Sequence, residues 1–283
     1  MKKIICCIGF SSLSACSSAP SHAPRVAPSS AIGTASEAAA SPAPPAVRSA
    51  PEPIFEAIKA RDAERLEKLL DADPSLASAR RADGVSAVLL ALSARNGELF
   101  LRPQTNPLLR AILAHHPQLD AFEAAAVGDL KRVMAEIDRD PGFVRAGHAP
   151  PIAWTALQFA AFGGQLETAK LLLERGADVG AIAQTKFRNN PLQIALLTGQ
   201  LEVARLLVAK GADVNAKQAE GFTALHTAAE LGSEPLIRLL LDAGADVNAK
   251  AEDGRRPLDV ALRDNRSEAA ELLRQRGAKP GRE

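Results

Sequence analysis

The chain repeats one pattern at a nearly fixed interval, and this constrains its fold more than any other feature. A leucine that ends a short Thr-Ala-Leu or Pro-Leu element recurs at positions 157, 192, 225 and 258, at intervals of 35, 33 and 33 residues. A second segment follows each of the first three elements and ends in Gly-Ala-Asp-Val, as in LETAKLLLERGADV and LEVARLLVAKGADV. A period of this length indicates stacked units, each of which buries its apolar face against its neighbours.

Each unit is predicted to be a pair of short helices. Thr155 and Thr223 stand where a side chain can cap the first helix, and small residues such as Ala160 and Ala228 allow two helices to approach closely. The Asp253-Gly254 pair is the clearest hairpin signal between units. A glycine near the end of each second helix suits the left-handed conformation that stops a helix. These glycines are Gly176, Gly211, Gly244 and Gly277.

The elements WTALQFAA, NNPLQIAL, FTALHTAA and RRPLDVAL resemble the T-P-L-H-x-A signature of the ankyrin repeat. The histidine of that signature is present as His226, and it is replaced elsewhere by Gln158, Gln193 and Asp259. We interpret His226 as a packing and hydrogen-bonding residue of the repeat.

The first half of the chain resembles divergent units of the same kind. Residues 54–79 and 122–146 share a layout in which Asp-Pro replaces the Gly-Ala-Asp ending. The unit between them is interrupted by about ten residues around Arg102–Pro107. The resemblance therefore implies an all-α ankyrin-repeat solenoid of about seven helix-turn-helix units with hairpin fingers. It spans residues 52–283, with divergent units in 52–152 and clearer ones in 153–279.

The N-terminus has the features of a bacterial export signal. Two lysines precede an apolar run, Ile4–Leu13, that is too short to span a bilayer. The run leads into Leu-Ser-Ala-Cys, which resembles the lipobox of bacterial lipoproteins. This resemblance implies a signal peptide over residues 1–15 and a lipidated, palmitate-bearing Cys16; a generic signal peptide is the alternative. Because Ser17 is not the aspartate associated with inner-membrane retention, we expect an outer-membrane anchor that faces the periplasm.

Residues 16–51 are rich in Pro, Ala and Ser and contain almost no large apolar side chains. Such a segment cannot bury enough surface to fold, so we predict a disordered tether with a reach of roughly 30 Å. All three cysteines, Cys6, Cys7 and Cys16, precede or begin this tether. The repeat region must therefore be stable without disulfides.

Composition and motifs argue against several classes of function. The 34 basic and 33 acidic residues give a net charge of +1 without long runs of one sign, so nucleic acid is not an expected partner. Phosphate-binding loops, zinc signatures and nucleophile elbows are absent from the sequence. We interpret His115-His116 as a solvated pair and His148 as a loop residue. We expect no catalysis, cofactor, metal or small-molecule substrate.

The ankyrin resemblance also implies a concave surface made of finger tips and exposed positions of the inner helices. Large apolar side chains at such positions are typical binding anchors. The alternative is that they pack against neighbouring fingers, with Trp154 covering the next hairpin. The candidate partner-binding residues are Trp154, Phe162, Phe187, Leu197, Phe222, Glu230 and Leu231.

Together these features predict a membrane-anchored periplasmic module that binds an unidentified protein through its concave face. One hypothesis is a scaffold or regulator of a cell-envelope partner. The alternative hypothesis is an immunity-type lipoprotein that neutralises a secreted toxin, and an enzyme is the third. If the anchors fail as a binding site, the interrupted segment Arg102–Pro107 is the next candidate.

Overall fold

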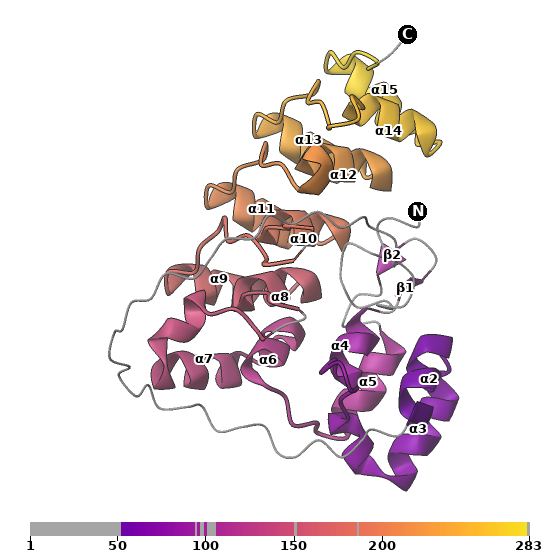
Figure 1. Cartoon of the computed structure of the whole chain (residues 1–283), viewed down its shortest axis with the longest axis vertical. Helices are drawn as coiled ribbons and strands as arrows, with labels where there is room; N and C mark the ends of the chain where they lie inside the picture. The colour runs from indigo at the N-terminus through magenta and orange to yellow at the C-terminus, as the bar shows by residue number, and fades with distance from the viewer. Residues whose placement is uncertain are drawn as a thin grey trace, which may run out of the picture.

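The computed structural model describes residues 52–93, 95–96, 99–100, 106–149, 152–185 and 187–281. The predicted signal peptide, Cys16, the tether and most of the segment 102–107 lie outside these residues. Within the described residues, fourteen α-helices form seven consecutive pairs, as the repeat predicts (Figure 1). The pairs are α2 (Glu52–Ala60) with α3 (Ala63–Ala72), α4 (Ala87–Leu92) with α5 (Pro107–Ala114), α6 (Ala121–Val127) with α7 (Leu130–Arg139), α8 (Ala156–Gly163) with α9 (Leu166–Glu174), α10 (Pro191–Leu197) with α11 (Leu201–Ala209), α12 (Ala224–Leu231) with α13 (Glu234–Asp242), and α14 (Pro257–Arg263) with α15 (Ser267–Gln275).

We number these pairs as units 1 to 7, and we call the first helix of each pair the inner helix. Hydrogen bonds to side chains define where the inner helices begin. The side chain of Asp120 accepts a hydrogen bond from the backbone N–H of Glu123 at 2.8 Å, and Asn190 accepts one from Gln193 at 2.9 Å. The predicted helix-stopping glycines have φ between +86° and +87°, which confirms their left-handed conformation.

The core lies where successive inner helices stack, and small residues bring these helices close together. The closest approach is between α6 and α8, where a Cβ on Gly163 would lie 1.8 Å from the carbonyl oxygen of Ala126. Only glycine fits there. From unit 3 onward, each inner helix packs directly on the next inner helix, and each outer helix packs on the next outer helix.

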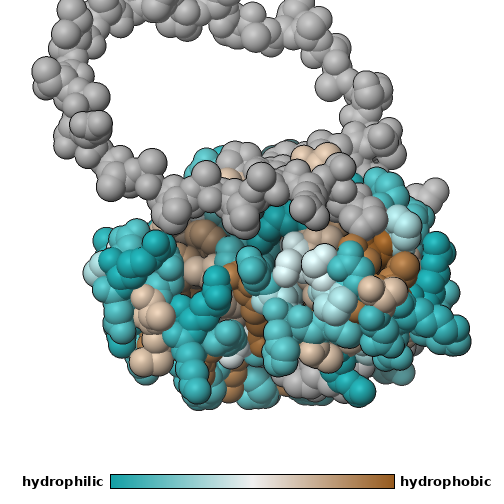
Figure 2. All heavy atoms as spheres, turned by 90° about the horizontal axis from the view of Figure 1, so that it is seen from below, coloured by the Kyte–Doolittle hydropathy of each residue, from teal (hydrophilic) through white to brown (hydrophobic). Residues whose placement is uncertain are grey.

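The stack is interrupted between units 2 and 3. Among the described helices, neither the pair α4 and α6 nor the pair α5 and α7 makes the direct packing contacts seen between other neighbouring units. In Figure 1, the upper pairs follow one another up the page, whereas α2–α5 lie beside α6 and α7. Figure 2 shows this end of the molecule as mainly hydrophilic, with hydrophobic residues in small separate areas.

A missing finger accounts for the interruption. In most places a backbone hairpin, which we call a finger, joins one unit to the next; fingers lie at residues 80–86, 147–155, 183–189, 218–222 and 251–255. Between α5 and α6 the connection is only the six residues His115–Asp120. Conversely, fourteen residues separate α4 from α5 and include the two-residue strands β1 (Arg95–Asn96) and β2 (Leu99–Phe100). The predicted insertion is confirmed, and it replaces the finger after unit 2.

Candidate binding surface

A ladder of side-chain hydrogen bonds holds units 4 to 7 together. The third residue of each inner helix is Gln158, Gln193 or His226 in units 4 to 6. Each side chain accepts a hydrogen bond from the backbone N–H at the start of its own helix, at 2.8 to 3.1 Å. Each also contacts a backbone carbonyl of the following finger, at 2.8, 3.1 and 3.2 Å respectively. Glutamine and histidine are therefore interchangeable here, because both can accept and donate.

His226 must be neutral to fill this role. Its Nδ1 atom accepts the Thr223 N–H, so Nε2 carries the proton and donates to the Arg255 carbonyl at 3.2 Å. A second proton on Nδ1 would face a donor. Burial correspondingly lowers the pKa of His226 below its ordinary value. The prediction of a structural role for His226 is consistent with this geometry.

Three of the predicted surface residues are interior residues. Trp154, Phe162 and Leu197 are only 2%, 3% and 5% exposed. The Trp154 ring lies 5.5 Å from the ring centroids of both Phe159 and Phe162, in edge-on arrangements. The expectation that these three side chains are exposed is therefore wrong. The finger bearing Trp154 folds back so that its ring packs over the end of its own inner helix.

The other predicted residues remain partly accessible. Phe187, Phe222, Glu230 and Leu231 are half-buried. The guanidinium of Arg255 lies 5.0 Å from the centre of the Phe222 ring. Burial raises the pKa of Glu230, whose carboxylate lies 3.8 Å from Arg263.

Leu262, at the end of α14, is 45% exposed and was missed by the sequence analysis. It lies one helical position before the residue equivalent to Glu230, so the repeat register could have identified it. We call the five accessible residues the open surface. The open surface consists of Phe187, Phe222, Glu230, Leu231 and Leu262.

Exposure at the end of the inner helices changes along the stack. The residue seven positions after the N-cap is Phe162 in unit 4, Leu197 in unit 5, Glu230 in unit 6 and Arg263 in unit 7. The first two are buried, the third is half-buried and the last is exposed. The accessible part of this face therefore belongs to units 6 and 7.

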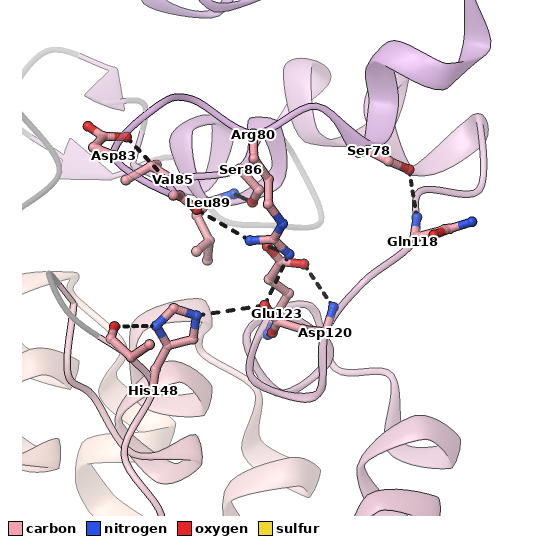
Figure 3. A network of polar contacts seen from close by, with 12 residues as sticks. Ser78, Arg80, Asp83, Val85, Ser86, Leu89, Gln118, Asp120, Glu123 and His148 are labelled. Atoms are coloured by element: carbon pink, nitrogen blue, oxygen red, sulfur yellow. Dashed lines mark hydrogen bonds and ion pairs between the residues drawn. The ribbon is translucent and has the colours of Figure 1, made fainter. Parts of the chain in front are cut away.

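A second group of polar residues gathers at the interruption between units 2 and 3 (Figure 3). Arg80, on the first finger, lies 3.0 Å from Asp120 Oδ2 and 2.8 Å from Glu123 Oε1. The latter is a charge contact, because Oε1 has no well-aligned hydrogen bond. The other oxygen of each carboxylate takes part in the capping of α6. His148 Nε2, on the next finger, lies 3.7 Å from Asp120 Oδ2. We call Arg80, Asp120, Glu123 and His148 the joint cluster.

The joint cluster perturbs the pKa of three of its members. Burial and the neighbouring Asp120 raise the pKa of Glu123, which is 1% exposed. Burial opposes charge on Asp120 and His148 as well, but their mutual contact outweighs it. The pKa of Asp120 is therefore lowered and that of His148 is raised. The interpretation of His148 as a loop residue holds for its position but omits this contact.

On its opposite side, the same interruption contains a cavity of about 370 Å³. Leu113, Pro117 and Leu119 line it from unit 2 and the connection, and Val127 and Asp129 line it from unit 3. In the parts of the chain that the structure describes, no group of three or more His, Cys, Asp or Glu side chains could hold a metal ion. No helix among the described residues is long and apolar enough to cross a membrane.

Comparison with known families agrees with this architecture. The family model described as "Ankyrin repeats (3 copies)" matches residues 122–218 and 213–283. These matches cover more than half of the chain, so the protein belongs to the ankyrin repeat family. No curated protein matches the sequence. Ankyrin repeats form a protein-interaction module and typically a non-catalytic scaffold, and the helix pairs described above are such a module.

Proposed function

We propose that this protein is a non-catalytic binding module, held on the periplasmic side of a bacterial outer membrane by a lipid on Cys16, that captures a cell-envelope protein through its open surface. The observation that carries the binding site is the change along the stack from buried to accessible apolar residues. Burial withdraws Trp154, Phe162 and Leu197 from contact with a partner. The open surface is where an aromatic ring, aliphatic side chains and a carboxylate remain within reach.

The chemistry of the open surface suits a protein partner. Phe222 and Leu231 offer apolar area beside the charged groups of Arg255, Glu230 and Arg263. Interfaces commonly place such apolar anchors inside a polar rim. Glu230 is held in a setting that disfavours its charge, so a cationic group of the partner would gain a carboxylate that solvent stabilises poorly.

The test is capture from envelope extracts by the full chain and by a variant with Phe187→Ala, Phe222→Ala and Leu231→Ala. We expect the variant to fold and to lose its partner, because anchor residues commonly cost about 2 kcal/mol or more each when truncated. The matched control is Met134→Ala, which removes an exposed apolar side chain from α7 outside the open surface. A triple variant that retains the same partner would place the site elsewhere.

Trp154→Ala provides a second control. Because the ring is buried, its removal should cost about 3–5 kcal/mol of folding stability. Loss of binding by this variant should therefore accompany a lower melting temperature, whereas the open-surface variant should lose binding at an unchanged melting temperature.

The anchoring part of the proposal is tested by Cys16→Ser. Acylation requires the thiol, so the variant should lose palmitate labelling and leave the membrane fraction. Membrane retention without label would overturn the lipid anchor. The identity of the captured partner separates an envelope scaffold from the immunity hypothesis, which requires a secreted toxin.

A further inference from the structure

The joint cluster occupies the place that a finger takes elsewhere in the stack. Arg80 lies on the finger before unit 2 and His148 on the finger after unit 3, and no finger stands between them. Asp120, the last residue of the short connection, contacts both of them. One carboxylate therefore links two fingers that would otherwise be separated by a third.

The contacts between units 2 and 3 are correspondingly polar. Besides the pairs made by Arg80, the backbone N–H of Gln118 donates to Ser78 Oγ at 2.8 Å. The helices of the two units do not pack as other neighbours do, and a cavity lies on the far side. Charge contacts therefore carry more of the attachment at this joint than at any other described boundary between units.

The hydrogen bonding of His148 determines what its ring presents to Asp120. The Nδ1 atom lies 2.7 Å from the carbonyl oxygen of Ala149, and a carbonyl can only accept, so Nδ1 carries a proton. In the neutral ring Nε2 then bears a lone pair directed at the carboxylate. In the protonated ring Nε2 bears an N–H, and the contact becomes attractive. This is the reverse of His226, whose surroundings suit the neutral ring.

We propose that the joint between units 2 and 3 is a hinge whose closed form is latched by the joint cluster, and that proton uptake at His148 closes it. With His148 neutral, one cation faces two carboxylates, so the cluster carries one excess negative charge. A proton on His148 balances that charge and ties Asp120 to the finger of unit 3. Units 1 and 2 are then fixed relative to units 3 to 7.

The groups that face His148 come from each neighbouring element. Asp120 and Glu123 belong to the start of α6, and both favour the protonated ring. Arg80 approaches from the first finger and holds the two carboxylates. The remaining neighbours are the rings of Phe122 and Phe159, at 5.2 and 5.6 Å, which carry no charge.

The hinge is tested by measuring a distance across it. In the full chain, with Cys6, Cys7 and Cys16 replaced by serine, spin labels are attached at Glu67→Cys on α3 and Lys131→Cys on α7, which are exposed positions on either side of the joint. The in-block control pair is Lys131→Cys with Lys210→Cys. Distance distributions are recorded at about pH 5.5 and about pH 8, on either side of the ordinary histidine pKa.

We expect the cross-joint distribution to be narrow at the lower pH and to broaden and shift at the higher pH, while the control pair stays constant. His148→Gln should abolish this response. His226→Gln should keep it, because glutamine occupies the equivalent position in units 4 and 5. Asp120→Asn is a second, conservative variant: asparagine still caps the helix but cannot attract the protonated ring, so the response should also vanish.

An unchanged cross-joint distance in the unsubstituted cluster would overturn the proposal, as would a response that survives in both His148→Gln and Asp120→Asn. The measurement requires no partner. Its outcome is therefore independent of whether the open surface binds a protein.

Discussion

Units 1 and 2 and units 3 to 7 are built from the same helix pairs but are held together differently. From α6 onward, inner helices stack directly, and Gln158, Gln193 and His226 connect each unit to the next finger. At the corresponding position unit 2 has Leu89, an apolar residue, and no finger follows its second helix. The comparison shows that the finger, rather than the helix pair, carries the polar connection between units. Where the finger is absent, a separate cluster of charges takes over.

The largest effect is expected from truncations that cut the stack at these two kinds of boundary. Removing residues 1–119 separates the chain at the joint, so the remaining units 3 to 7 should fold and melt cooperatively. Removing residues 1–154 also takes away α6 and uncovers α8. Phe159, for example, loses Phe122, whose ring lies 5.7 Å away, and exposing one such ring costs about 1.5–3 kcal/mol.

Thermal melts and solubility of the two fragments check this prediction. We expect the shorter fragment to be much less stable. If both truncations lowered the stability equally, the joint would be a boundary like any other, and the contrast between the two regions would be lost.

A smaller effect is expected from Gly163→Ala, which tests the tight stacking of units 3 and 4. The new Cβ would overlap the carbonyl oxygen of Ala126, and backbone at this site cannot move aside cheaply. Overpacking of this kind costs typically about 1–3 kcal/mol. The matched control is Gly147→Ala, where the nearest atom would be 3.9 Å away. Chemical denaturation should show a loss for the first variant and almost none for the second.

The smallest effects concern the two histidines, which should respond to pH in opposite directions. The folded pKa of His148 is raised, so its stabilising contribution is fully present below the ordinary value of 6.5 and is lost as the pH rises through the folded pKa. The folded pKa of His226 is lowered, so its contribution is present above 6.5 and declines as the pH falls through the folded pKa.

Melting temperatures of His148→Gln and His226→Gln between about pH 5 and pH 8 separate these contributions. Relative to the unsubstituted protein, His226→Gln should lose less stability on acidification, and His148→Gln should gain less. Parallel pH profiles for the two variants would mean that the geometry at these rings does not control their protonation.

The repeat period determined the architecture, because it reports local requirements that every unit must meet. A capping side chain at the start of an inner helix and a left-handed glycine after an outer helix are properties of a few neighbouring residues. Thr155 and Gly176 could therefore be interpreted without knowledge of the rest of the fold. The family of the protein and the number of helix pairs followed from these signals.

Burial at the ends of the inner helices could not be predicted in the same way. Phe162, Leu197 and Glu230 occupy one register position, and the repeat treats them alike. Whether such a side chain is covered depends on the particular finger beside it, as when the ring of Trp154 turns onto Phe162. This is a contact between side chains of one unit that the period does not encode.

The joint is the clearest case of a feature that the sequence concealed. Successive inner helices start after Ser86, Asp120 and Thr155, so the period continues through the missing finger without a break. The residues removed between α5 and α6 reappear between α4 and α5, and counting alone cannot reveal the exchange. The sequence by itself determined that helix pairs stack, because helix caps and apolar periodicity are local. Only the tertiary structure decided that Arg80, Asp120 and His148 meet, because the absence of a finger from one place in space brought three separate segments together.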